Sequence, residues 1–254
     1  MILRRITEHV KAQNWFAVAL DFVIVVVGVF IGIQVANWNE ARAFRAQEQA
    51  YLAQLRDEIK SNTTMIDYQA RFVERVVDSS LSTLSFIERE QDCTDACESA
   101  LIDAFHASQV CGTGYATSKY QEMSRLGLPS DENVRSKVDA FFSFIDGWDV
   151  VNASPPEYRE RVRSAFSPQE SAILWKRCYR ITSGTFEELT ADCAEDLKAL
   201  DISPTLRRMR NDAEIAGMLR FWAGQNEYAL QFYPDMLAHA DTAMDAIDQA
   251  LEKR

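Results

Sequence analysis

The five cysteines are the residues of this 254-residue chain whose type and spacing could most directly do chemistry. Cys93 and Cys97 are spaced C-x3-C, which is neither the C-x2-C redox motif nor the C-x2-C-H haem attachment. On a helix their Cα atoms would be about 6 Å apart, near the upper limit for a disulfide, and Cys111 could pair with either one. Cys178 and Cys193 could close a separate loop. We expect structural disulfides, with at least one cysteine left over or bonded to another chain; a reactive redox pair is the weaker alternative.

A metal or cofactor site would need side chains that converge, and the sequence offers few candidates. His106 falls between Cys97 and Cys111, so a Cys2His cluster could form, although a lone helical histidine is more often a surface or satisfied residue. The segment Cys111–Tyr115, "CGTGY", lacks the third glycine and the preceding strand of a dinucleotide-binding loop, and we expect a turn between helices there. G-x-S-x-G, H-E-x-x-H and P-loop motifs do not occur in the sequence. We therefore predict no metal, no cofactor and no enzymatic activity.

The composition indicates an acidic, helical protein. A net charge of −11 argues against a nucleic-acid partner, which would require a basic face. With only 9 Gly and 6 Pro, the chain is poor in the residues that turn-rich β folds need. Strictly alternating apolar and polar runs flanked by hairpin turns are also missing from the sequence. The expected fold class is all-α.

An apolar run near the N-terminus predicts a membrane-spanning helix. Between Trp15 and Trp38 the only ionisable residue is Asp21. As a helix this interval is about 35 Å long, enough to cross a hydrocarbon core of about 30 Å, and the tryptophans stand where interfacial anchors are expected. We accordingly divide the chain into a short cytoplasmic N-terminus (1–14), a transmembrane helix (15–38) and a periplasmic helical domain (39–254).

A cleaved signal peptide is the alternative for this run, because "ARA" at 41–43 loosely resembles a cleavage site. The run is too long for that role, and the segment that follows has a helical pattern. We therefore expect an uncleaved anchor in the lipid bilayer.

The orientation of this anchor follows from charge and cysteine content. Arg4, Arg5 and Lys11 precede the span, whereas Arg42 and Arg45 follow it, which favours a cytoplasmic N-terminus. Cysteines in an acidic outer domain suit an oxidising compartment. For a Gram-negative source, the protein would be a single-pass inner-membrane protein with a periplasmic C-terminal domain.

Two glycines suggest that the span does more than anchor. Gly28 and Gly32 form a small-xxx-small pair, which lets another helix approach closely. Asp21 lies seven residues before Gly28 and shares its face, where a carboxylate is less costly at a helix interface than in lipid. We predict a helix–helix contact in the membrane. The alternative places Asp21 among the headgroups and makes the glycines incidental.

The segment "VVVGVFIGIQVANWNEAR" resembles the start of a family of bacterial membrane proteins that carries a domain-of-unknown-function label. Those proteins have a short basic N-terminus, an acidic residue opening the span, and an N-W-N-E exit. The matching residues here are Asp21, Gly28, Gly32, Gln34, Asn37, Trp38, Asn39 and Glu40. A second block, Thr117–Phe144, is similar to a later pattern of that family, with Met123 where leucine is usual. The resemblance implies a topology and no activity.

Two long helices are expected at the ends of the soluble part. After Glu40 apolar residues recur at spacings of three, four and seven, which predicts one amphipathic helix as far as Ile87. The polar run at 60–64, "KSNTT", could mark a kink. A second long helix should open at Ser203 and be kinked at Pro234. Its seam comprises Leu230, Tyr233, Leu237, Ala240, Met244, Ile247 and Leu251. We expect an antiparallel pair of these helices, or alternatively an intermolecular coiled coil.

Short helices with recognisable ends should lie between the two long ones. Capping boxes are predicted at Ser154–Glu157, Ser167–Glu170 and Thr185–Glu188, and helix ends at Gly127 and Gly147. Two dense aromatic groups should pack in the core, and any that prove exposed would mark a docking patch or an apolar ligand groove. These are Phe141, Phe142, Phe144 and Trp148, and Phe221, Trp222, Phe232 and Tyr233.

These features together favour a non-enzymatic, membrane-anchored accessory or scaffold protein. It would dock on another integral membrane protein or complex, or associate with itself, through its span and its periplasmic helical domain. The alternative function is a periplasmic ligand-sensing helical domain that signals through a partner membrane protein. An enclosed apolar pocket with a few converging polar groups would favour the second function.

Overall fold

The computed structural model describes residues 15–89, 93–112, 114–152, 157–183 and 186–252, without the side chains of 15–18, 21 and 148–152. It confirms the all-α fold, with a long helix near each end of the chain. The elements are α2 (Trp15–Ile87), α3 (Cys97–Ala107), α4 (Ser118–Arg125), α5 (Glu132–Asn152), α6 (Glu157–Ser164), α7 (Pro168–Arg177), β1 (Tyr179–Thr182), β2 (Phe186–Leu189), α8 (Ala194–Leu197), α9 (Ser203–Asn211), α10 (Ala213–Leu230) and α11 (Phe232–Glu252). The chain divides into two compact units, Met1–Tyr51 and Leu52–Arg254.

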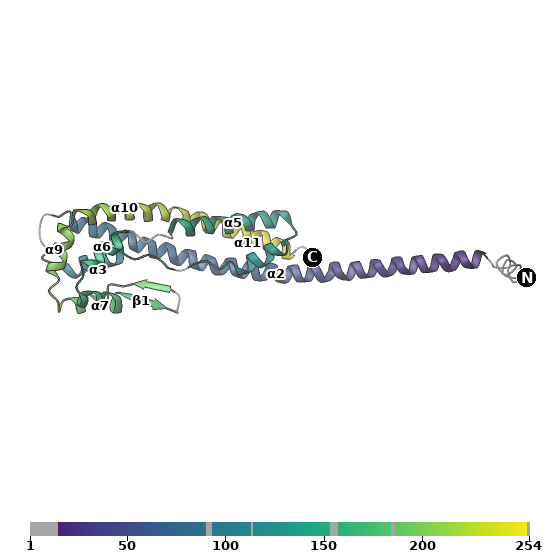
Figure 1. The fold of residues 1–254 in the computed structure, drawn as a ribbon, viewed down its shortest axis with the longest axis horizontal. Coiled ribbons are helices and arrows are strands. Elements are labelled where there is room, and N and C mark those ends of the chain that lie inside the picture. Colours follow the sequence, from purple (N-terminus) through teal and green to yellow (C-terminus); the bar gives the residue numbers. More distant parts are fainter. Residues whose placement is uncertain (1–14, 90–92, 113, 153–156, 184–185, 253–254) are drawn as a thin grey trace, which may run out of the picture. The chain divides into compact units, whose positions relative to one another are not determined.

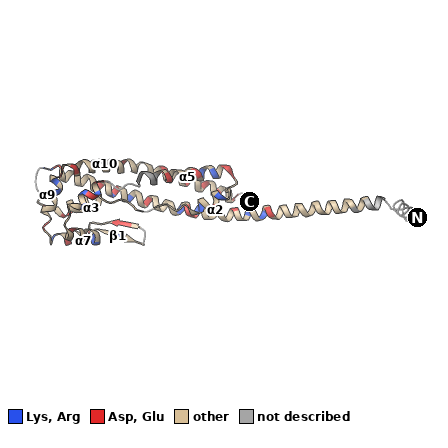
Figure 2. Ribbon diagram, in the orientation of Figure 1, with Lys and Arg blue, Asp and Glu red and all other residues tan. Residues whose placement is uncertain are grey.

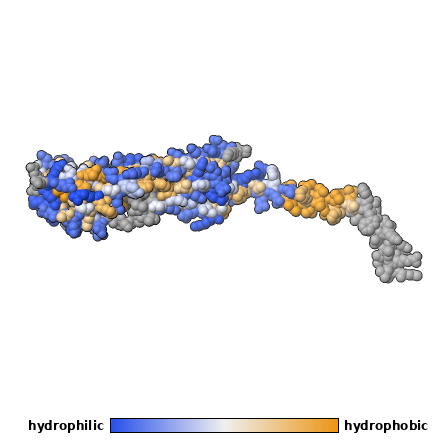
Figure 3. Space-filling model, turned by 90° about the horizontal axis from the view of Figure 1, so that it is seen from above, coloured by the Kyte–Doolittle hydropathy of each residue, from blue (hydrophilic) through white to orange (hydrophobic). Residues whose placement is uncertain are grey.

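The first unit contains the apolar start of α2. Its helix is the one described helix that is long and apolar enough to cross a membrane, and none of its most apolar window is buried inside the protein. Figure 3 shows this concentration of hydrophobic residues. Trp38, which follows the apolar run, is 57% exposed, and the Arg42 guanidinium lies 5.7 Å from the centre of its ring.

In the second unit, α2 runs antiparallel to helices α10 and α11 from the C-terminal end of the chain. Arg56 near the start of this part of α2 forms an ion pair with Asp248 of α11 at 2.6 Å. Glu88, just past the end of α2, pairs with Arg220 of α10 at 3.1 Å. Contacts at the two ends therefore run in reverse order, and the predicted antiparallel arrangement is visible in Figure 1.

The predicted kink at 60–64 is replaced by an unbroken helix whose polar residues hold another segment. Asn62 is 1% exposed, and its amide both donates to the Ala116 carbonyl and accepts from the Ala116 N–H, each at 2.8 Å. The hydroxyls of Thr63 and Thr64 donate back to the Lys60 carbonyl one turn earlier. The polar run thus fixes the chain that enters α4.

Glu58, one turn before Asn62, caps α4 from outside that helix. Its carboxylate accepts hydrogen bonds from the backbone N–H groups of Lys119 (2.8 Å) and Tyr120 (3.0 Å) and from the Ser118 hydroxyl (3.1 Å). The residue before the helix, Thr117, makes no side-chain cap. A negative charge at a helix N-terminus satisfies free N–H groups and interacts favourably with the helix dipole.

The C-terminal region is three helices rather than the single kinked helix that we predicted. The breaks fall at Asp212, whose side chain caps α10 by accepting from the Glu214 N–H, and at Gln231. Pro234 is the third residue of α11 and so stands in a first turn, where a missing N–H costs little. The helix therefore ends just before the proline instead of bending at it.

Of the predicted helix starts and ends, some are confirmed and others are wrong. The capping box at Ser167 is present: its hydroxyl accepts from the Glu170 N–H at 3.3 Å while the Glu170 carboxylate accepts from the Ser167 N–H at 2.6 Å. Gly127 follows α4 with φ of 70°, as a helix end requires. Gly147, in contrast, lies inside α5, so that prediction is wrong. The proposed box at 154–157 falls mostly outside the described residues.

The β hairpin was not predicted from the sequence. β1 and β2 pair antiparallel, with Arg180 opposite Glu188 and Ile181 opposite Glu187. The capping box proposed at 185–188 is wrong, because Phe186–Leu189 is a strand.

Most of the aromatic groups pack in the core, as expected. Phe141 and Phe142 are fully buried, and Trp222 donates from its indole nitrogen to the Ala107 carbonyl at 2.9 Å. Phe221 is instead 69% exposed, and the Trp148 side chain lies outside the described residues. Acidic and basic residues intersperse over the helices of the second unit in Figure 2.

Candidate functional site

The candidate site lies where the β hairpin meets α2, and a disulfide closes the base of the hairpin. Cys178 precedes β1 and Cys193 follows β2; the two form a disulfide with Cα atoms 5.3 Å apart, as the sequence suggested. The Thr190 N–H donates to the Cys178 carbonyl at 3.1 Å, which extends the pairing by one step beyond the strands. Because the disulfide and this hydrogen bond hold both ends together, the short hairpin keeps its register.

A buried histidine supports the same base. His106 of α3 is 3% exposed, and its Nε2 lies 3.1 Å from the Cys178 carbonyl oxygen, so this nitrogen carries the proton and donates it. Burial lowers the pKa of His106 to about 4, although the bond to the Cys178 carbonyl acts in the opposite direction. The Cys2His cluster that the sequence left open does not form, because the His106 ring donates to the Cys178 carbonyl and Cys97 is bonded to Cys93. Within the described residues, no group of three or more His, Cys, Asp or Glu side chains could hold a metal ion.

Tyr68 of α2 fastens the hairpin to the helix. Its hydroxyl accepts from the Glu187 N–H at 2.7 Å and donates to the Glu187 carbonyl at 3.1 Å. In an antiparallel pair alternate residues direct these groups away from the partner strand, and Glu187 is such a residue of β2. Burial raises the pKa of Tyr68, and the neighbouring Cys111 adds to this effect.

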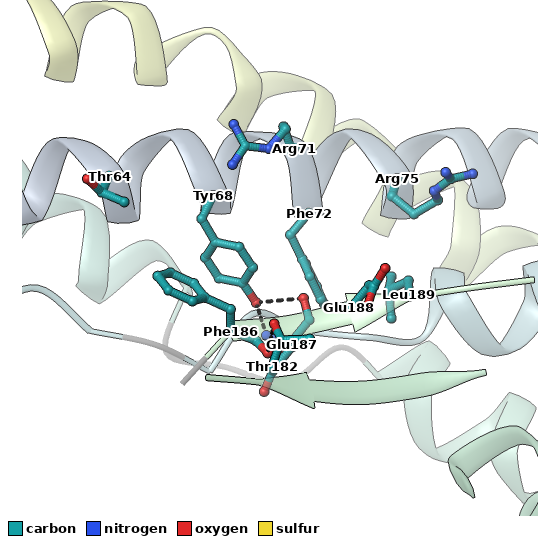
Figure 4. Close-up of a pocket in the computed structure, with 10 residues that line it drawn as sticks. All are labelled: Thr64, Tyr68, Arg71, Phe72, Arg75, Thr182, Phe186, Glu187, Glu188 and Leu189. Atoms are coloured by element: carbon teal, nitrogen blue, oxygen red, sulfur yellow. Dashed lines mark hydrogen bonds between the residues drawn. The ribbon is translucent and has the colours of Figure 1, made fainter. Parts of the chain in front are cut away.

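A groove opens between α2 and the hairpin, with a volume of about 420 Å³. Tyr68 and Phe72 of α2 and Phe186 and Leu189 of β2 give it an apolar lining. In Figure 4 the rings of Tyr68, Phe72 and Phe186 lie between the helix and the strands, whereas the guanidinium groups of Arg71 and Arg75 lie at the level of the helix. The arrangement suits an apolar body with a charged end.

Glu187 and Cys111 both lie near tyrosines beside the hairpin. The Glu187 carboxyl group lies near the Tyr179 hydroxyl, and its Oε1 would lie 3.4 Å from a Cβ placed on Gly112. Burial raises the pKa of Tyr179, and its contact with Glu187 adds to this. Glu187 Oε2 is buried and has no hydrogen-bond partner among the described residues. Cys111 is outside both disulfides.

The second disulfide joins Cys93 and Cys97, with Cα atoms 5.6 Å apart. Cys97 is the first residue of α3 and Cys93 belongs to the preceding loop, so the pair is not held on one helix. Of the pairings that the sequence left open for Cys111, neither forms in this structure.

The residues predicted for the membrane interface all belong to α2. A Cβ placed on Gly28 or Gly32 would meet nothing within 4 Å among the described residues beyond its own helix, so this face is open. Trp15 is the first residue of α2, but its side chain and that of Asp21 lie outside the described residues. The structure therefore keeps the two glycines available for close approach and leaves the role of Asp21 a prediction.

Sequence reasoning missed the groove because it missed the hairpin. The apolar spacing shows α2 only as one amphipathic stripe, although Arg71 and Arg75 are spaced i, i+4 and so share a face. The available signal was the pair of cysteines around a short β-rich run, "YRIT" and "FEEL".

Comparison of the chain with protein-family models, curated proteins and solved structures finds no match. The family resemblance of the N-W-N-E segment therefore stays a prediction.

Proposed function

We propose that this chain is a non-enzymatic, single-pass membrane protein that docks on another membrane protein complex or on a second copy of itself. The observation that carries the proposal is the exposed apolar surface of α2 from Phe22 to Ala36, which no other described part of the chain covers. An apolar surface of this length is stable in a bilayer. The open face at Gly28 and Gly32 is where a second helix can approach closely.

The proposed location is the bacterial inner membrane, with the N-terminus cytoplasmic and the helical domain periplasmic. Two observations support it: the excess of Arg and Lys before the span, and two disulfides in the outer domain, since disulfides persist in oxidising compartments. Alkylation of thiols in intact spheroplasts, with and without reductant, tests it. Reductant-dependent labelling from outside the cell membrane is expected, and labelling only after lysis would contradict this orientation.

The docking proposal is tested by gentle detergent extraction from native membranes, followed by sizing and mass spectrometry. We expect the chain to migrate in a defined complex that Gly28→Ile or Gly32→Ile disperses, because either side chain holds an approaching helix away. Phe30→Leu is the matched control: it changes an apolar side chain of the same helix outside the glycine face and should leave the complex intact. Migration as a monomer that is indifferent to both glycine substitutions would refute the proposal.

A second candidate function is ligand sensing by the outer domain, and the groove between α2 and the hairpin favours it. The groove has an apolar lining with charged groups at its edge, which is the usual composition of a small-molecule site. A change in the protease sensitivity of a partner on ligand addition would separate sensing from passive docking.

A further inference from the structure

The groove offers a ligand a rigid aromatic surface. Tyr68 is held in place by the Glu187 backbone, and its ring meets that of Phe186 edge to face with centroids 4.8 Å apart. Phe72 is 5% exposed and fixed in the core behind it. A volume of about 420 Å³ lies at the small end of ligand pockets, which span about 300–1,000 Å³. A single aromatic ring with a short chain suits this size.

The mouth of the groove carries two exposed arginines. Arg71 and Arg75 are one turn apart, and among the described residues no carboxylate lies within ion-pair distance of either. Guanidinium groups bind carboxylates through paired, charge-assisted hydrogen bonds.

Two glutamates, Glu187 and Glu188, also line the groove. The Glu187 side chain lies near Tyr179 and against Gly112. Glu188 is exposed and stands opposite Arg180 in the hairpin. The four charged side chains that line the groove therefore sum to zero. Recognition of an anion rests on the hydrogen-bond donors of the two guanidinium groups, which no carboxylate among the described residues engages at ion-pair distance, and not on a net positive charge.

Asp103 of α3 interacts electrostatically with Arg75. It accepts a hydrogen bond from the Ser79 hydroxyl at 3.2 Å, and it does not line the groove. Burial raises its pKa, while Arg75 acts in the opposite direction across more than ion-pair distance. The interaction with Asp103 therefore leaves the hydrogen-bond donors of the Arg75 guanidinium unused.

From this geometry we propose that the groove binds a soluble amphipathic carboxylate, with its apolar body against Phe72 and Phe186 and its carboxylate at the α2 edge of the groove, within reach of the Arg71 or Arg75 side chain. The complementarity is twofold: the aromatic lining selects for apolar bulk, and the arginine pair selects for negative charge. The site is independent of the span, so it holds whether or not the membrane helix associates with a partner.

The test uses the full chain in nanodiscs of zwitterionic lipid, with 4-phenylbutyrate as the probe in equilibrium dialysis. The uncharged 4-phenylbutan-1-ol and the cationic 4-phenylbutylamine are compared with it. Saturable binding of the carboxylate alone is expected. Equal binding of the alcohol would show an apolar slot without anion recognition, and no saturable binding at millimolar concentrations would also overturn the proposal.

Variants identify the site. Arg71→Gln with Arg75→Gln should weaken binding by about tenfold or more, the effect of losing charge-assisted hydrogen bonds. Thr182→Trp should block the groove from the exposed strand without entering the core. The control, Arg207→Gln with Lys176→Gln, removes the same charge from exposed positions away from the groove and should bind as the wild type does. Equal losses in both double variants would show a general charge effect and contradict the site.

A last experiment tests whether the groove binds a free carboxylate or the headgroup of an anionic lipid. The dialysis is repeated in nanodiscs that contain phosphatidylglycerol. We expect 4-phenylbutyrate to bind with little change. Exclusion of the probe by the anionic lipid, with recovery in the zwitterionic discs, would show that lipid is the occupant and would overturn the proposal of a soluble ligand.

Discussion

The hydroxyl of Tyr68 satisfies both outward-facing backbone groups of Glu187, a residue 119 positions later in the chain, at 2.7 Å and 3.1 Å. One side chain on a helix thereby takes the place of a third strand at the edge of β2. Backbone groups at a strand edge are otherwise open to pairing with another chain. The contact also fixes the distance between α2 and the hairpin, and with it the width of the groove.

The first prediction concerns Tyr68→Phe, which keeps the ring and removes the hydroxyl. The Glu187 N–H and carbonyl would lose their partner at a site where Tyr68 is only 9% exposed. Leaving such groups unsatisfied costs about 1–3 kcal/mol, so we expect the free energy of unfolding in urea to fall by that amount. Faster amide exchange at Glu187 should accompany it.

Tyr228→Phe is the matched control for this substitution. Tyr228 is 58% exposed, and its change should alter the free energy of unfolding by no more than about 0.5 kcal/mol. If both variants lose the same stability, the Tyr68 hydroxyl does not hold the hairpin.

The two disulfides should differ in their contribution to stability. The Cys178–Cys193 bond spans 15 residues and the Cys93–Cys97 bond spans 4. In the chain-entropy description a closed loop stabilises more as it lengthens, by about 3 kcal/mol for the former and about 2 kcal/mol for the latter. In urea unfolding, the variant with serine at 178 and 193 should therefore lose more stability than the variant with serine at 93 and 97. Only the former should make the hairpin sensitive to protease. The reverse order would mean that native strain outweighs loop entropy.

A third prediction compares the stability lost on removing a buried helix cap, Glu58, with that lost on removing an exposed ion pair, Arg56–Asp248, on the same helix. Glu58→Ala removes a carboxylate that accepts three hydrogen bonds at the start of α4, and is expected to cost about 2–3 kcal/mol. Arg56→Ala breaks the pair with Asp248, whose side chains are 38% and 40% exposed and therefore screened by water. Little change in the unfolding midpoint is expected for Arg56→Ala. An equal effect of the two substitutions would contradict the role of Glu58 as the cap of α4.

The long helices could be predicted from the sequence because their signal is periodic and extends over many residues. Apolar spacing of three and four predicts α2, and the antiparallel pairing follows from two complementary stripes. The hairpin could not be predicted in this way. Each strand has four residues, and what stabilises them is distant: the Cys178–Cys193 bond, the Tyr68 hydroxyl and the His106 ring. Local pattern carries no information about such partners.

The same limit explains the errors at polar and glycine positions. Asn62 looked like an interruption because its partner, the Ala116 backbone, is 54 residues away. Gly147 looked like a helix end, but α5 continues through it. The helix contact at Gly28 and Gly32 stays a prediction, because the partner that would test it is not part of this chain's described structure.

The last prediction is a dependence of stability on pH that arises from His106. Its pKa is about 4 in the folded protein because it is buried, compared with 6.5 for an exposed histidine. Between these values the unfolded chain binds a proton that the folded protein does not, so the free energy of unfolding falls as the pH falls from 6.5 towards 4. The full difference corresponds to about 3 kcal/mol. Above pH 6.5 the histidine contributes no slope.

The variant His106→Gln isolates this effect, because glutamine can still donate to the Cys178 carbonyl but does not titrate. Burial raises the pKa of the neighbouring Asp103, which opposes the trend at the acidic end, so the measurement is the difference between the two proteins. Urea unfolding of wild type and variant at several pH values should show a shallower decline below pH 6.5 in the variant. Parallel curves would mean that His106 becomes protonated inside the folded domain, and the hairpin base would then be more open to water than its burial implies.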